Sequence, residues 1–293
     1  MRAAAILGLG CSPKLLKPFQ TDNTIDWRMG MPASSAEADV ILLFGGDGTI
    51  HRHLAQLIRL GLPVLVVPAG SGNDFARALG IRRTLDSVAA WQKFHTGNAN
   101  VRPIDIGVID PVMAEMPAPR YFCSIAGIGL DSEVARRANQ LPRWLRGHGG
   151  YLFTLVPTIF RFAPVLIKIL MPGDGKTPNQ PWTLRSNRPT TLAAIANTPV
   201  YGDGMKIAPR AQLDDGLLDI CIVGAVSPFK LFRLFPTVYS GNHLKVREVE
   251  YFTSPQVRIE TGHPLDIYAD GEYVCQTPVE ISIVPAALKV ITL

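Results

Sequence analysis

Two short apolar segments, each followed by a glycine-rich turn and then by a helical pattern, constrain the fold of this chain more than any other feature. Residues 40–44 (VILLF) precede the turn at 45–49 (GGDGT), and residues 64–67 (VLVV) precede the turn at 68–74 (PAGSGND). Apolar strands that lack polar alternation and lead directly into helices are typical of parallel sheets covered on both faces. Together with a further apolar segment at residues 3–9, they predict an α/β domain at the start of the chain.

The later part of the chain has many short apolar segments separated by turn residues, a pattern typical of antiparallel sandwiches and barrels. We expect strands at residues 104–109, 121–125, 165–171, 190–196, 217–223, 257–260, 265–268, 279–284 and 288–293, and helices at 130–139, 149–162 and 227–239. We therefore predict an α/β N-terminal domain with a parallel sheet over residues 1–98. A predominantly antiparallel β-sandwich domain follows over residues 99–293, and ligands are expected in the cleft between the two domains.

The composition excludes several classes of protein. Of the 293 residues, 47% are hydrophobic and 18% are charged, which excludes an intrinsically disordered chain. The formal net charge of +5 suits anionic partners such as nucleotide phosphates and lipid headgroups. Because the chain has no recognisable nucleic-acid-reading motif, we expect no nucleic acid partner. The cysteines lie far apart without a C-x-x-C pair and are expected to be reduced thiols of a cytoplasmic protein: Cys11, Cys123, Cys221 and Cys275.

The most apolar stretch, residues 151–171, is interpreted as a helix followed by a buried strand. It contains Pro157, Arg161, Pro164 and Lys168, and charged side chains in the middle of a bilayer are costly. We therefore expect that the chain does not span a membrane, and that any membrane attachment is peripheral.

The first glycine turn predicts a phosphate-binding loop. Gly45, Gly46 and Gly48 allow backbone amides to approach a ligand closely, and the N-terminus of the helix that begins near Thr49 attracts negative charge. Asp47 would repel a phosphate unless a divalent cation lay between them, which points to Mg-ATP. The structural alternative is an ordinary strand–helix turn in which Asp47 caps the helix.

The second glycine turn, which contains Gly70 and Gly72, strengthens the prediction of a nucleotide site. Two such loops at the ends of neighbouring parallel strands can build one site. Ser71 can donate to a phosphate oxygen, Asn73 can bond a base or ribose, and Asp74 can join the metal network. The alternative is that Asn73 and Asp74 only cap the next helix.

These two loops, GGDGT and PAGSGNDFARALG, resemble those of the diacylglycerol kinase catalytic family, which includes bacterial lipid kinases and sphingosine kinases. The resemblance continues in family order at residues 103–107 (PIDIG), 122–131 (FCSIAGIGLD), 197–209 (NTPVYGDGMKIAP), 211–219 (AQLDDGLLD) and 268–272 (YADGE). It implies a fold like that of NAD kinases and diacylglycerol kinases. It also implies an ATP-dependent kinase that transfers the γ-phosphate to the hydroxyl of diacylglycerol or a related lipid alcohol. GGDGT also occurs in NAD kinases, so a kinase of a soluble substrate such as NAD is an alternative.

The resemblance implies how the chain would hold its nucleotide. Residues 45–49, together with Ser71, match nucleotide contacts of the family. Asp47, Asp74 and Asp105 match acidic residues that organise the magnesium ion of the nucleotide and its waters. ATP and Mg²⁺ are therefore the expected cofactors.

The resemblance also assigns a base and a second metal site. Glu272, in the D-G-E segment, matches the general base that takes the proton from the lipid hydroxyl, and with Asp47 it forms the expected catalytic pair. Asp215 and the backbone carbonyls of Gln212 and Leu217 match a structural magnesium site of bacterial members. Without the resemblance, both of these acidic segments would be interpreted as turns.

The chain departs from the family pattern in three places, one of which is a shorter segment before GGDGT. Residues 8–13 (GLGCSP) stand where family members have an Asn-Pro phosphate loop, and His51 stands where Asn is common. His51 and His53 are two residues apart, so they point in different directions on a helix and are interpreted as structural or surface residues. A catalytically weak lipid- or nucleotide-binding regulator is therefore the alternative from another class of protein.

The expected partner is a lipid substrate at a membrane surface, and a homodimer is also considered. Two segments are candidates for contact with the lipid. The first is basic and aromatic, a composition that suits an anionic interface, although a solvated basic helix is an equal alternative: Arg136, Arg137, Leu141, Arg143, Trp144, Leu145 and Arg146. The second is apolar and is either core or part of a lipid groove: Phe229, Leu231, Phe232, Leu234 and Phe235.

Overall fold

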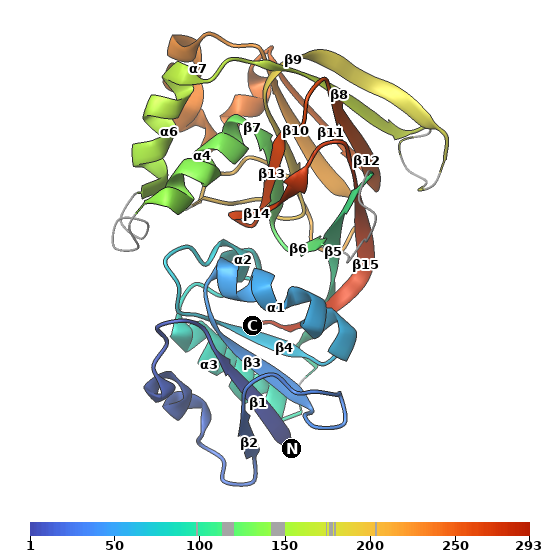
Figure 1. The fold of residues 1–293 in the computed structure, drawn as a ribbon. Helices are drawn as coiled ribbons and strands as arrows, with labels where there is room; N and C mark the ends of the chain where they lie inside the picture. The colour runs from blue at the N-terminus through green and yellow to red at the C-terminus, as the bar shows by residue number, and fades with distance from the viewer. Residues whose placement is uncertain are drawn as a thin grey trace.

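The computed structural model describes residues 1–293 with the exception of 98, 113–119, 142–149, 174, 176, 177, 179 and 203. The chain folds into two domains, with the N-terminal residues in the lower part of Figure 1 and most of the later residues in the upper part. The N-terminal domain contains, in chain order, β1 (Arg2–Leu7), η1 (Pro13–Phe19), β2 (Asp26–Met29), β3 (Val40–Gly45), α1 (Asp47–Leu60), β4 (Val64–Pro68), α2 (Asp74–Ala78) and α3 (Thr84–His95).

The N-terminal sheet is parallel, as the sequence predicts. β1 pairs in parallel with β2 and β3, and β3 pairs in parallel with β4. Every residue of β3 is buried, which explains why this strand shows no polar alternation. Trp91 of α3 is fully buried, and its Nε1 donates to the carbonyl of Phe19 at 3.0 Å. The segment between β1 and β2 is thereby attached to the core of the domain.

The C-terminal domain is predominantly antiparallel, and this part of the predicted fold class is also confirmed. The strands of this domain pair antiparallel in the order β14-β13-β7-β9-β8-β12-β15, and β10 joins β9 to β11. The elements are β5 (Val101–Pro111), β6 (Arg120–Phe122), β7 (Ile125–Gly129), α4 (Leu130–Gln140), α6 (Gly150–Arg161), β8 (Val165–Pro172), β9 (Trp182–Ala196), β10 (Leu218–Gly224), α7 (Pro228–Leu234), η2 (Phe235–Val238), η3 (Asn242–Lys245), β11 (Val249–Ser254), β12 (Gln256–Thr261), β13 (Asp266–Ala269), β14 (Glu272–Gln276) and β15 (Val279–Ile291).

Several predicted elements are wrong in their extent. The expected strand at 121–125 is divided into β6 and β7 by a bend at residues 123–124. The expected helix at 227–239 is α7 followed by the 3-10 turn η2. The two strands expected at 279–284 and 288–293 are one strand, β15, whose register shifts between Val284 and Leu288. Ala286, inside this shift, has a left-handed backbone with φ of 52°.

Two strands connect the domains. β5 and β15 run antiparallel along most of their length, and the end of β15 pairs with β4 through Val290 and Val64. Leu288 and Val290 are buried in the N-terminal core, which also contains Ile104 of β5. The chain therefore leaves the N-terminal domain along β5 and returns to it at its C-terminal end, as the neighbouring positions of β4 and the C-terminus show in Figure 1. The division of the chain at residue 98 stays a prediction.

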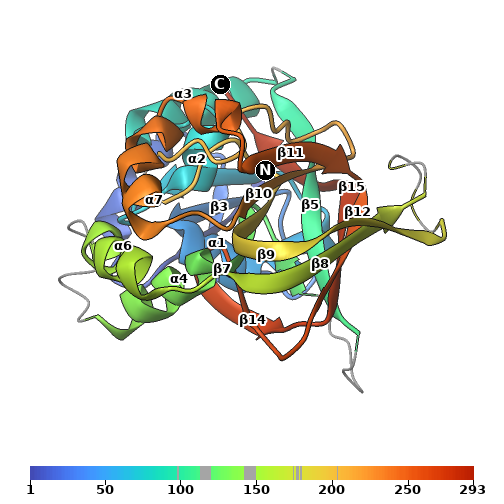
Figure 2. The ribbon, with the colours of Figure 1, turned by 90° about the horizontal axis from the view of Figure 1, so that it is seen from above.

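The stretch at 151–171 is the helix α6 followed by the strand β8, as expected. None of the described helices is both long enough and apolar enough to cross a membrane. α4, α6 and α7 gather on one side of the C-terminal sheet (Figure 2). The cysteines are free, and Cys123, Cys221 and Cys275 are buried.

Candidate active site

The two glycine loops touch each other through their backbones. They follow the neighbouring parallel strands β3 and β4, so they meet at the carboxyl edge of the sheet. Ala69 N donates to the carbonyl of Gly45 at 3.0 Å. A Cβ atom on Gly46 would lie 2.9 Å from the Cα of Gly70, a separation that leaves no room for a side chain. The glycines at 46 and 70 are therefore required by the close approach of the loops.

Asp47 connects the first loop to the second. It is the first residue of α1, and Gly46 occupies the N-cap position instead. Its carboxylate accepts the backbone N–H groups of Asp74 and Phe75 at the start of α2, both at 3.0 Å. Burial raises the pKa of Asp47 to about 6, and the neighbouring acids Asp74 and Asp270 also raise it, although the two N–H bonds lower it. Asp47 is thus a partly buried acid held at the junction of both loops.

The polar residues of the second loop have different environments. Asn73 adopts a left-handed backbone with φ of 63°, and its side-chain amide bonds the N–H and the carbonyl of Gly70 at 3.0 and 2.7 Å. Its side chain therefore shapes the loop. Asp74 is buried and accepts a hydrogen bond from Arg77 at 2.8 Å. Ser71 is exposed. The predicted contacts of these residues with a nucleotide stay predictions.

Thr49 connects the first glycine loop with the segment that follows β1. A Cβ atom on Gly8 would lie 2.6 Å from Thr49 Oγ1, and one on Gly45 would lie 2.6 Å from Thr49 Cβ. Gly8 N also donates to the carbonyl of Phe44 at 2.7 Å. The segment at 8–13, which departs from the family pattern, is therefore packed directly on the predicted phosphate loop.

Glu272 approaches the first loop from the other domain. It is the first residue of β14, and its side chain is exposed. Its Oε1 lies 3.2 Å from the position that a Cβ atom on Gly48 would take. The structure therefore brings the expected base next to Gly48, which lies in the N-terminal turn of α1 and follows Asp47 directly. The role of Glu272 as a base stays a prediction.

Asp270 is a structural residue that sequence reasoning missed. Its side chain has no exposed surface, and its carboxylate accepts the N–H groups of Cys123 and Ser124 at 2.9 and 2.8 Å. His51 Nδ1 lies 3.2 Å from Asp270 Oδ2. The D-G dipeptide signalled a turn correctly, since Asp270 has a positive φ of 51°. No local signal pointed to its partners, because they lie about 150 to 220 residues away in the sequence.

Asp105 and the segment at 212–217 lie together at the connection between the domains. The carboxylate of Asp105 accepts the backbone N–H of Gly216 at 2.7 Å and that of Ala286 at 2.8 Å. Asp105 N donates to the carbonyl of Leu213 at 2.6 Å. Asp215 Oδ1 accepts the N–H of Leu217 at 3.0 Å, and burial together with the charge of Asp105 raises the pKa of Asp215. These contacts join the predicted metal residues of β5 and of the D-D-G turn into one cluster.

The predicted magnesium network of Asp47, Asp74 and Asp105 stays a prediction. Within the described residues, no three His, Cys, Asp or Glu side chains gather as ligands for a metal ion. Magnesium is typically held by one or two carboxylates together with substrate phosphates. Asp47 and Asp74 lie beside the two glycine loops, but in the structure the carboxylate of Asp47 accepts two backbone N–H groups and that of Asp74 accepts Arg77. The structural site predicted at Gln212, Asp215 and Leu217 stays a prediction.

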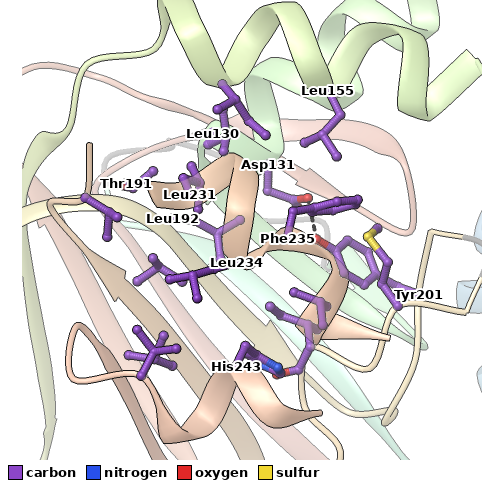
Figure 3. A pocket seen from close by; sticks show the side chains of 18 residues that line it. Leu130, Asp131, Leu155, Thr191, Leu192, Tyr201, Leu231, Leu234, Phe235 and His243 are labelled. Atoms are coloured by element: carbon purple, nitrogen blue, oxygen red, sulfur yellow. Dashed lines mark hydrogen bonds between the residues drawn. The ribbon is translucent and has the colours of Figure 1, made fainter. Parts of the chain in front are cut away.

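A narrow apolar cavity lies in the C-terminal domain between its helices and its sheet (Figure 3). It has a volume of about 80 Å³, and its lining is largely aliphatic and aromatic. Asp131 is a polar exception, and its carboxylate accepts a hydrogen bond from the hydroxyl of Tyr201 at 2.8 Å. His243 is another; its Nδ1 is buried without a hydrogen-bond partner, and burial lowers its pKa. Leu231, Leu234 and Phe235, from the segment expected to be core or lipid groove, line this cavity.

Solved structures share this two-domain arrangement. A diacylglycerol kinase from Bacillus anthracis strain Sterne is 16% identical and has a TM-score of 0.68, with 100% of this chain and 96% of that chain covered. An NAD kinase from Archaeoglobus fulgidus in complex with ATP is 15% identical and has a TM-score of 0.53, with 100% and 93% covered. The fold thus defines a class of two-domain proteins to which both kinds of kinase belong.

Sequence comparison identifies the family within this class. Residues 19–109 match the diacylglycerol kinase catalytic domain, and residues 124–292 match the YegS C-terminal NAD kinase beta sandwich-like domain. A diacylglycerol kinase of Mycobacterium tuberculosis strain H37Rv is 35% identical over 253 residues, which cover 86% of this chain and 76% of that protein. A diacylglycerol kinase of Bacillus subtilis strain 168 is 29% identical over 250 residues, with 85% and 76% covered. The chain belongs to the diacylglycerol kinase family of lipid kinases.

Proposed function

We propose that this protein transfers the γ-phosphate of ATP to the hydroxyl of diacylglycerol or a related lipid alcohol. One observation carries the proposal: the carboxylate of Glu272, from the C-terminal domain, lies against Gly48 in the glycine loop of the N-terminal domain. A base from one domain is thereby next to a phosphate-binding loop of the other. Phosphoryl transfer depends mainly on positioning and on charge neutralisation, with one carboxylate near the attacking hydroxyl.

The two glycine loops would bind the phosphates of ATP. Their glycines carry no side chain that would keep a phosphate from the backbone, although the N–H of Gly70 already bonds Asn73 Oδ1. Because α1 begins at Asp47, its N-terminus adds a favourable field for negative charge. Asp47 and Asp74 would hold the magnesium ion together with the phosphates. When bound, the ion neutralises the negative charge of the triphosphate. Ser71, which is exposed at the second loop, would donate to a phosphate oxygen.

Glu272 would accept the proton of the lipid hydroxyl while the hydroxyl oxygen attacks the γ-phosphorus of ATP and the bond to the leaving ADP breaks. Its side chain is exposed, so a substrate beside the glycine loop would be able to contact it. Asp270, two residues before it, is a poor candidate for this role. Its side chain is completely buried, and its carboxylate is already engaged by backbone N–H groups of the β6–β7 bend and by His51. The choice between the two acids of the D-G-E segment therefore favours Glu272.

The helical side of the C-terminal domain supports a lipid as the acceptor. Large aromatic side chains are exposed on α6 and α7, with Phe229 78% and Phe153 66% exposed. The ring of Phe160 packs against those of Phe229 and Phe232, at centroid distances of 5.4 and 5.9 Å. An exposed aromatic cluster of this kind is typical of surfaces that contact membranes or other apolar partners.

The apolar cavity lies beneath these helices and is a candidate for an acyl chain. Its volume of about 80 Å³ is too small for a long chain, so a lipid would have to widen it. No residue of α7 is buried, which lets this helix move at low cost.

In the basic segment, Arg136 and Arg137 both form ion pairs with Glu133, at 2.8 and 2.6 Å. The other basic and aromatic residues of that segment, at positions 143–146, lie outside the described residues.

The proposal is tested by incubating the purified protein with labelled Mg-ATP and mixed micelles of diacylglycerol, and by analysing the products by mass spectrometry. We expect phosphate in the lipid fraction and a loss of at least about 100-fold for Glu272→Gln, which keeps the shape but removes the base. Asp266→Asn is the matched control, because Asp266 lies on the neighbouring strand and bonds Gln276 at the surface. Phosphorylation of NAD or of another soluble alcohol in place of lipid would contradict the proposal, as would full activity of Glu272→Gln.

A further inference from the structure

The turn that carries Glu272 is in contact with α1 of the other domain at more than one point. Gly48 and His51 are three residues apart on α1 and therefore lie on the same face of the helix. Gly48 faces Glu272 Oε1, and His51 Nδ1 lies 3.2 Å from Asp270 Oδ2. One face of α1 thus contacts both acids of the D-G-E turn.

Within its own domain this turn is firmly held. Asp270 accepts the backbone N–H groups of Cys123, Ser124 and Ile125 at 2.9, 2.8 and 3.3 Å, and its own N–H donates to the carbonyl of Ile125 at 3.0 Å. Asn139 of α4 donates to the carbonyl of Gly271 at 2.8 Å. The turn therefore moves as part of the C-terminal domain, and its distance from the glycine loops depends on contacts across the cleft.

The contact between His51 and Asp270 is suited to hold the turn at a fixed distance from the glycine loops. The side chain of Asp270 is fully buried and that of His51 is 19% exposed, so the pair is shielded from water. A ring nitrogen that faces a carboxylate must carry the hydrogen, so His51 Nδ1 is the donor. Burial by itself lowers the pKa of His51, but the hydrogen bond and charge of Asp270, with the charge of Glu272, outweigh it and raise the pKa. A cavity of about 290 Å³ beside the pair adds Arg120, Tyr121 and Tyr273 to its surroundings.

We propose that His51 is a positioning residue for the phosphoryl transfer. By donating from Nδ1 to Asp270, it fixes the D-G-E turn on α1 and so sets the distance between Glu272 and the phosphate loop at Gly48. This inference rests on the proposed function, because it assigns His51 to the geometry of the same site. His51 itself does not touch the reacting atoms; it acts through Asp270.

Three variants separate this role from a general effect on folding. His51→Leu replaces the imidazole by an apolar side chain of similar length and so removes the hydrogen-bond donor. His51→Asn keeps a donor, because the amide nitrogen of asparagine takes nearly the place of Nδ1 in histidine. His53→Leu is the matched control, since the half-buried His53 lies on the same helix, two residues further on, and its Nδ1 contacts Gln56 of the same helix. All three leave the backbone N–H bonds of Asp270 in place, so we expect each variant to fold.

The kinetic test measures kcat and KM with Mg-ATP and micellar diacylglycerol. Because a misplacement of about 1 Å can cost about 100-fold in rate, we expect His51→Leu to lower kcat by roughly 10- to 100-fold. The KM for ATP should change little, since the glycine loops are untouched. His51→Asn should restore kcat to within about 3-fold of wild type, and His53→Leu should match wild type. Wild-type kcat in His51→Leu, or an equal loss in His51→Leu and His51→Asn, would overturn the inference.

A second measurement keeps the inference testable if the protein phosphorylates no lipid, which would defeat the proposed function alone. The distribution of distances between spin labels on one exposed residue of each domain reports whether the turn stays on α1. We expect a broader distribution in His51→Leu than in wild type, and the wild-type distribution in His51→Asn and His53→Leu. The same distribution in all four proteins would show that His51 does not hold the turn on α1.

Discussion

Substitution of Asp105 by asparagine tests whether this residue stabilises the connection between the domains. The side chain of Asp105 is nearly inaccessible, and its two oxygens accept the N–H groups of Gly216 and Ala286. Each hydrogen bond to a charged group contributes about 1.5–3 kcal/mol, and an unsatisfied buried N–H costs about 1–3 kcal/mol. Asparagine keeps one acceptor and turns an NH₂ group toward the other N–H. The expected loss of stability is therefore about 3 kcal/mol or more.

The assay is thermal unfolding at neutral pH, with and without added magnesium. For a chain of this size about 1 kcal/mol corresponds to roughly 2–4 °C, so Asp105→Asn should unfold roughly 6–12 °C below wild type in both conditions. Asp214→Asn is the control, because Asp214 is exposed and pairs with Arg102 at the surface, where ion pairs contribute about 1 kcal/mol or less. A midpoint within about 3 °C of wild type would refute the reasoning. So would a loss seen only when magnesium is present, which would assign the carboxylate to a metal ion.

Two further predictions concern the glycine loops. Gly46→Ala should lower kcat for lipid by at least about 10-fold and weaken ATP binding measured by calorimetry, because its Cβ would meet the Cα of Gly70 at 2.9 Å and separate the loops; unchanged ATP affinity would contradict this. Asp47→Asn should abolish transfer, and it carries a pH-independent cost because its NH₂ group faces one of the N–H groups of Asp74 and Phe75. A carboxyl whose pKa rises from 3.8 to about 6 on folding destabilises the folded protein by up to about 3 kcal/mol once it is ionised above about pH 6, and by nothing below about pH 4. The unfolding temperature of Asp47→Asn should therefore rise relative to that of wild type between about pH 4 and about pH 6 in a series of thermal scans, and a difference that stays constant over this range would contradict the assignment to this carboxyl.

The elements that the sequence predicted well have strong local signals. β3, α1 and β4 combine fully buried strands, helical periodicity and glycine turns within one continuous segment, and each lies where it was expected. The elements that were missed lack such signals. β2 has four residues, none of them buried, and β14 begins with two exposed residues. Their pairing with neighbouring strands decides their conformation, and pairing is not visible in a local pattern.

The error at β15 has a specific physical cause. Residues 285–287 (PAA) interrupt the apolar pattern and suggest a turn between two strands. In the structure the register shift between Val284 and Leu288 absorbs these residues, and Ala286 takes a positive φ. The N–H of Ala286 is bound by Asp105, which lies 181 residues earlier in the chain. The interruption is therefore held by a distant side chain, which no local reading of the sequence could supply.

Some parts of the candidate site could be predicted from the residues alone, whereas others needed the family resemblance. The loops followed from residue types and spacing, whereas the place of Glu272 in the site followed from the family resemblance. Neither source pointed to the bond between His51 and Asp270, because the two residues are 219 positions apart and each looks ordinary in its own segment. His51 was interpreted as a structural or surface residue, and its contact favours the structural alternative, but this contact joins the two domains beside the expected base.

The two long-range contacts act at different places in the same connection. Asp105 binds both the D-D-G turn and the register shift of β15, where the chain passes between the domains. His51 and Asp270 join the domains at the cleft, next to Glu272. The end of β15 is buried in the N-terminal core, so β5 and β15 connect the two domains near the shift. Asp105 holds β15 at that shift, and the contact between His51 and Asp270 joins the domains beside Glu272. The distance between the base and the phosphate loop would then depend on both, although neither residue touches a substrate.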